Sequence, residues 1–148
     1  MLYTSRYQNP ELRSSNYTTV RISLGTPKWS LGYIIDVIMP DLMPYGLLGQ
    51  YPAYEPFKQA YFQQLDRVGV ERIAAQLNCL ESYGKDVVLL CYEDIRIGPE
   101  VWCHRRAFAE WWERATGVNI PELPDPSPVK HTTKTVSGEL SGKQMSLF

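Results

Sequence analysis

Residues able to carry chemistry gather in two short segments, Cys91-Tyr92-Glu93 and Cys103-His104-Arg105. The first follows an unbroken apolar run typical of a buried strand, and the second opens a helical pattern. In open α/β sheets, ligands bind at the carboxyl ends of the strands, and a helix N-terminus favours anions. We therefore predict one crevice at this edge, with Cys91, Glu93 and His104 as candidate catalytic residues.

The same crevice is predicted to bind an anion such as a phosphate or nucleotide. The candidate binding residues are Arg21, Lys28, Trp29, Tyr92, Cys103 and Arg105. Arg105 offers a bidentate fork for an anion, and Arg21 joins it if their strands are parallel neighbours. Two plainer interpretations stay open, in which Arg21 faces solvent from an alternating strand and Trp29 covers the edge of the core.

The cysteines and the histidine have several interpretations. Either Cys91 or Cys103, near His104 and a helix N-terminus, could be an activated thiolate, with Glu93 as general acid or base. Alternatively Cys91 is a small buried hydrophobe, His104 is a core histidine, and Glu93 pairs with an arginine. Zinc is disfavoured, because no fourth ligand is visible and an adjacent Cys-His pair is not the usual spacing. The sequence thus predicts no metal and no cofactor.

A second motif is formed by the five residues Gln144, Met145, Ser146, Leu147 and Phe148. It resembles the peptide by which bacterial proteins bind the DNA polymerase sliding clamp. Burying Leu147 and Phe148 in a clamp pocket would contribute roughly 1.5 to 3 kcal/mol each, and the amide of Gln144 can both donate and accept hydrogen bonds. The alternative is a disordered tail that happens to carry two apolar residues.

These segments must be positioned by a small set of strands and helices. Strands are predicted over 2–7, 18–24 and 86–91, the last covered on both faces as in a parallel sheet. Apolar stripes predict helices over 54–68, 70–80 and 103–116. Between them lies a long irregular stretch, 28–52, rich in proline and glycine. The pattern indicates a small three-layer α/β domain with a mainly parallel sheet flanked by helices.

The domain is predicted to end near residue 120. Prolines at 121, 124, 126 and 128 and a Ser/Thr/Lys/Gly-rich stretch follow, and this composition has too few apolar residues to pack. We therefore predict a domain over 1–120, a flexible linker over 121–143 and a clamp-binding peptide over 144–148, with the tail disordered.

Several segments together resemble the prokaryotic proteins grouped as domain-of-unknown-function family 488. They are Val20-Arg21-Ile22-Ser23-Leu24, Pro27-Lys28-Trp29, Tyr61-Phe62, Leu89-Leu90-Cys91-Tyr92-Glu93 and Cys103-His104-Arg105. The resemblance covers residues 1–120 and implies a compact three-layer α/β domain. It implies no particular reaction.

Net charge, cysteine content and the length of apolar runs limit the kinds of partner and compartment that the protein can have. The 148 residues carry a net charge of −1, with 15 basic and 16 acidic side chains, so a broad basic surface for unaided nucleic-acid binding is excluded. Three cysteines, an odd and sparse set, argue against a disulfide framework and for a reducing compartment. No apolar run is long enough to span a membrane, so we expect a cytoplasmic protein with no membrane partner.

The function predicted from these features is a replication- or repair-associated accessory protein of DNA metabolism. Its domain would bind a nucleotide or nucleic acid, and the sliding clamp would recruit it. One alternative is a thiol- or carboxylate-dependent enzyme acting on a nucleotide-type substrate, and another is a pure protein-protein adaptor.

Overall fold

The computed structural model describes residues 1–130, which form a parallel β-sheet with helices packed against it. The four strands are β1 (Leu2–Arg6), β2 (Tyr17–Arg21), β3 (Val37–Ile38) and β4 (Asp86–Cys91). They lie in the order β1-β4-β2-β3, and every neighbouring pair is parallel. Residues 87–91 of β4 are all buried, as expected for a central strand covered on both faces. Parallel pairing places the carboxyl ends of the strands at one edge, where the crevice was predicted.

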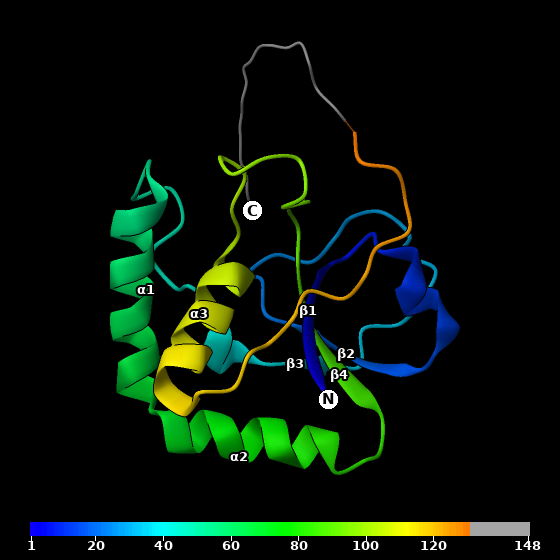
Figure 1. The fold of residues 1–148 in the computed structure, drawn as a ribbon, viewed down its shortest axis with the longest axis horizontal. Coiled ribbons are helices and arrows are strands. Elements are labelled where there is room, and N and C mark those ends of the chain that lie inside the picture. Colours follow the sequence, from blue (N-terminus) through cyan, green and yellow to red (C-terminus); the bar gives the residue numbers. More distant parts are fainter. Residues whose placement is uncertain (131–148) are drawn as a thin grey trace.

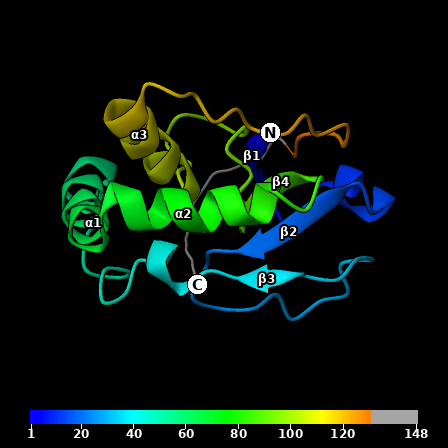
Figure 2. The same ribbon diagram turned by 90° about the horizontal axis from the view of Figure 1, so that it is seen from below.

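Three α-helices cover one face of this sheet (Figures 1 and 2). They are α1 (Tyr54–Val68), α2 (Val70–Glu81) and α3 (His104–Thr116), which confirms the three predicted helices. Their apolar stripes pack against Val20, Val87 and Leu89 in one hydrophobic cluster. Only Gly69 separates α1 from α2, and its φ of 97° lies in the region that favours glycine, so the chain turns sharply there.

The opposite face is covered without α-helices. The 3-10 helix η1 (Pro10–Ser14) and extended segments pack on Val88 and Leu90 through a second cluster that includes Leu12 and Leu123. In Figure 1 this helix, in dark blue, lies on the far side of the strands from α1. The predicted α/β class with a parallel sheet is confirmed, while one of its outer layers is built from a 3-10 helix and loops.

Two details of the sheet differ from the prediction. The second strand ends at Arg21 rather than at Leu24, because the Ser23 hydroxyl donates a hydrogen bond to the Gly25 carbonyl (2.7 Å) as the chain turns away. The irregular stretch 28–52 contains the unpredicted strand β3 and the short 3-10 helix η2 (Pro40–Leu42). A strand of two residues is too short to leave a period in the sequence.

Residues 121–127, which we call the C-terminal strap, pack along β1, so the predicted flexible linker is wrong over these residues. The backbone N–H of Leu123 donates to the Thr4 carbonyl (2.8 Å), and that of Thr4 donates to the Pro121 carbonyl (3.0 Å). The Arg6 Nε donates to the Asp125 carboxylate (2.7 Å), and Leu123 is buried. Proline is compatible with an extended segment at a sheet edge, so its abundance here did not mark disorder.

Among residues 1–130, no helix is long and apolar enough to cross a membrane. The rest of the predicted linker, from residue 131, and the predicted clamp-binding peptide at 144–148 lie outside the described residues. Their prediction rests on the sequence.

Candidate functional site

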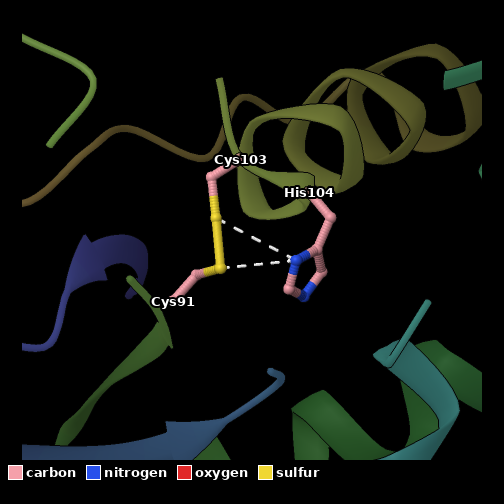
Figure 3. Close-up of side chains that lie close together, drawn as sticks. All are labelled: Cys91, Cys103 and His104. Carbon is pink, nitrogen blue, oxygen red and sulfur yellow. Dashed lines mark hydrogen bonds between the residues drawn. A yellow bond between two sulfur atoms is a disulfide. The ribbon is translucent and has the colours of Figure 1, made fainter. Parts of the chain in front are cut away.

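The carboxyl edge of the sheet brings Cys91 and Cys103 together. Cys91 is the last residue of β4, and Cys103 is the extended residue that caps the N-terminus of α3. Their sulfur atoms form a disulfide, with the two Cα atoms 7.0 Å apart (Figure 3). The cysteine count had argued against disulfides, and this expectation is wrong for Cys91 and Cys103. An odd total does not prevent two of three cysteines from pairing. The argument for a reducing compartment loses its support, and Cys79 is free and exposed.

His104 lies directly beside this pair and is buried. Its Nε2 is 2.6 Å from the Ile22 carbonyl oxygen, which can only accept a hydrogen bond, so Nε2 carries the proton. Its Nδ1 is therefore unprotonated and faces the sulfurs, 3.3 Å from that of Cys91 and 3.9 Å from that of Cys103 (Figure 3). Burial, assisted by the nearby charge of Arg105, lowers the pKa of His104 to about 4, so the imidazole is neutral near pH 7.

Glu93 and Tyr92 extend the site beyond Cys91. The Glu93 carboxylate is 3.9 Å from the Cys91 sulfur, and burial raises the pKa of Glu93, against the opposing charge of Arg105. The Tyr92 ring packs against Tyr7, with ring centroids 5.1 Å apart, and against the edge of Trp29. The buried disulfide therefore has two polar neighbours, Glu93 and His104.

Arg105 does not offer the exposed anion fork that the sequence suggested. Its side chain is fully buried, and its Nη2 and Nε donate to the two carboxylate oxygens of Glu122, at 2.7 and 3.1 Å. Glu122 also accepts a hydrogen bond from the Thr4 hydroxyl (2.7 Å), so α3, β1 and the C-terminal strap meet at this pair. The remaining Arg105 nitrogen, Nη1, is buried without a hydrogen-bond partner among residues 1–130.

Three further predicted anion-binding residues, Arg21, Lys28 and Trp29, lie at the carboxyl end of β2 or in the segment after it. That strand pairs in parallel with β4, as the convergence of Arg21 with the site requires. Burial raises the pKa of both Tyr7 and Tyr92, and the nearby charge of Arg21 opposes this in each. Arg21 donates a hydrogen bond to the Thr26 hydroxyl. Arg21 and Arg105 therefore have different hydrogen-bond partners. Lys28 and Trp29 are exposed.

Two contributors to the site were missed in the sequence. The Ile22 carbonyl, which orients His104, carries no side-chain signal. Glu122 lies in the segment assigned to a linker, and an acidic residue between prolines is not distinctive. Neither position could be assigned without the fold.

Comparisons with protein-family models, with curated proteins and with solved structures found no match to this chain. The resemblance to family 488 therefore stays a prediction, as does nucleotide or nucleic-acid binding. Function has to be argued from the geometry of the Cys91–Cys103–His104 site, which we call the cysteine-histidine centre.

The disulfide is expected to stabilise the domain. It closes a loop between residues 12 apart in sequence, and the loop-entropy relation gives a stabilisation of about 3 kcal/mol for a loop of this size. Reduction should lower the urea midpoint accordingly, measured with and without a phosphine reductant in buffer containing EDTA. The Cys79→Ser variant should show the same difference between its oxidised and reduced forms. Equal midpoints for oxidised and reduced wild type would show that the cross-link carries no stability.

Proposed function

We propose that this protein is a thiol-dependent redox enzyme whose reactive group is the Cys91–Cys103 pair. The observation that supports this most directly is the unprotonated Nδ1 of His104, 3.3 Å from the Cys91 sulfur. A disulfide with only a structural role needs no base beside it. Here a neutral, buried imidazole of fixed tautomer faces both sulfurs at the edge of the sheet where ligands of α/β proteins bind.

The proposed reaction is thiol–disulfide exchange with a small external dithiol. Its thiolate attacks one sulfur, forming a mixed disulfide and releasing the other sulfur as a thiolate. The second external thiol then resolves the mixed disulfide, leaving two thiols on the protein and a disulfide on the external compound. Two electrons and two protons pass to the protein. Because both cysteines are buried, each only 3% exposed, we expect a small substrate rather than a folded protein.

The neighbouring groups have distinct roles in this scheme. His104 accepts and returns the proton of Cys91, which is within hydrogen-bond reach once reduced. The N-terminus of α3 favours negative charge on Cys103, which caps that helix. Glu93, 3.9 Å from the Cys91 sulfur, is placed to relay the proton outward.

Alkylation followed by mass measurement tests this proposal. Of the three cysteines, one is free in the oxidised form, so native protein should gain one label before reduction and three after mild reduction. His104→Gln, which keeps an N–H for the Ile22 carbonyl, should slow exchange by about 100-fold, the lower range for a positioned acid-base group. Cys79→Ser is the control and should react at the wild-type rate with one label fewer. If the pair reduces only when the domain unfolds, the disulfide is structural and the proposal fails.

We also propose that residues 144–148 recruit the protein to a bacterial sliding clamp. The specific observation is the sequence Gln-Met-Ser-Leu-Phe at these positions, with a glutamine followed by an adjacent Leu-Phe pair. Such recruitment would concentrate a nearly neutral domain near DNA without a basic surface.

A further inference from the structure

We propose that the reduced cysteine-histidine centre binds one thiophilic divalent cation such as Zn²⁺, with both cysteines and His104 as ligands and Glu93 as the fourth. The sulfurs and a histidine nitrogen of this centre all lie within 4.8 Å of one another, and all three residues are buried. In a tetrahedral zinc site with Zn–S and Zn–N bonds of about 2.3 and 2.0 Å, neighbouring ligand atoms lie roughly 3.5 to 3.8 Å apart. The Nδ1 of His104 already lies 3.3 and 3.9 Å from the two sulfurs, and reduction of the disulfide frees the sulfurs to move apart to this spacing.

The orientation of His104 supports a ligand role. Histidines that bind metals almost always donate their other N–H to a carbonyl or carboxylate, which fixes the ring and its tautomer. Here Nε2 donates to the Ile22 carbonyl at 2.6 Å, and the free lone pair of Nδ1 faces the sulfurs. The ring needs neither rotation nor loss of a proton to bind a cation.

Glu93 is the candidate for the fourth ligand, and its carboxylate would have to move closer to His104 and Cys103 when the ion binds. Glu93 lies two residues after Cys91, and its carboxylate approaches the Cys91 sulfur to 3.9 Å. Two cysteines, one histidine and one carboxylate form a donor set that suits zinc. The chain spacing seemed unsuitable only because the ligands come from the end of β4 and the start of α3 rather than from one loop.

Metal binding and the disulfide exclude each other, so this inference rests on the proposed redox cycle. An external dithiol first converts the disulfide to two thiols and is itself oxidised to its disulfide. The two thiols then lose two protons and bind Zn²⁺ as thiolates. A buried pair of thiolates is costly without a counter-charge, and the cation supplies it.

The test uses the untagged 148-residue protein, reduced with a phosphine and desalted without oxygen. Zn²⁺ is titrated against a chromophoric chelator, and Co²⁺ is used as a spectroscopic probe for thiolate coordination. Reduced wild type and Cys79→Ser should each bind one ion per chain. Cys91→Ser should bind at least about 100-fold more weakly, and Glu93→Gln about 10- to 100-fold more weakly, as losses around metal sites do.

Oxidised wild type is a control that does not depend on whether a variant folds, because its polypeptide is the same as that of the reduced protein. It should bind no ion at this centre. The proposal is overturned if reduced wild type fails to take one ion, or if the oxidised form binds as tightly. Unchanged affinity in Glu93→Gln would remove Glu93 from the ligand set. Thiol counts on the same samples separate the two proposals. Three accessible thiols without metal binding refute the metal site alone, whereas a pair that resists reduction refutes the redox cycle.

Discussion

Arg105→Ala is expected to lower the free energy of unfolding by about 1.5 to 3 kcal/mol, the range for losing hydrogen bonds to a charged group, because Glu122, with 31% of its side chain exposed, can be partly solvated in the variant. The Arg105 side chain is fully buried, and both of its hydrogen bonds to Glu122 are lost in the variant. Glu122 would then keep its hydrogen bond from the Thr4 hydroxyl but lose the guanidinium paired with it. The variant should show a lower urea midpoint at neutral pH, with loosening of the C-terminal strap from β1 visible as faster amide exchange at Leu123.

The neighbouring arginine provides a matched control for this prediction. Arg106 is exposed, so Arg106→Ala should change stability by no more than about 0.5 kcal/mol. The loss of stability in Glu122→Gln should lie between those of Arg105→Ala and Arg106→Ala, because glutamine removes the charge of Glu122 and keeps the shape of its side chain. A wild-type midpoint for Arg105→Ala would mean that the strap is held by its backbone hydrogen bonds alone.

Sequence patterns predicted the elements with the strongest burial signals. The apolar run of β4 identified a central parallel strand because both of its faces are covered, and a stripe at helical spacing identified α1. Strand β3 was missed because two residues have no period, and because the surrounding prolines and glycines indicate loops. Helix α3 was placed to within one residue, since Gly117, with a φ of 76°, ends it.

The site was predictable in its location but not in its connections. Polar residues after β4 and at the start of α3 had to meet at one edge of the sheet, and Cys91, Glu93 and His104 do so. Pairing of the cysteines and the partner of Arg105 depend on contacts between segments far apart in sequence. The C-terminal strap was misassigned as a flexible linker because composition gives only the average polarity of a segment. Whether a segment packs is decided by a few specific contacts, such as the ion pair of Arg6 with Asp125.

Deleting Leu147 and Phe148 is expected to abolish binding to a bacterial sliding clamp and to leave the domain folded. The two side chains together would contribute roughly 3 to 6 kcal/mol if both are buried in the clamp. We expect an affinity on the order of micromolar, because ordering the peptide offsets part of the gain. Since a micromolar affinity corresponds to about 8 kcal/mol, the loss leaves binding near millimolar or weaker, which is too weak to detect. Binding is measured by calorimetry or fluorescence anisotropy with purified clamp.

The controls for this deletion separate docking from damage to the domain. Ser146→Ala keeps the glutamine and the Leu-Phe pair, so it should retain binding. A free peptide of residues 144–148 should compete with the full chain for the same pocket, at a similar affinity, if the domain adds no contact of its own. The core described over residues 1–130 is closed by Ile120 and Leu123, so the near-ultraviolet circular dichroism of its tryptophans should not change in the truncated protein. Clamp binding that survives the deletion, or that the peptide cannot displace, would place the contact on the domain surface and remove the assigned role of Leu147 and Phe148.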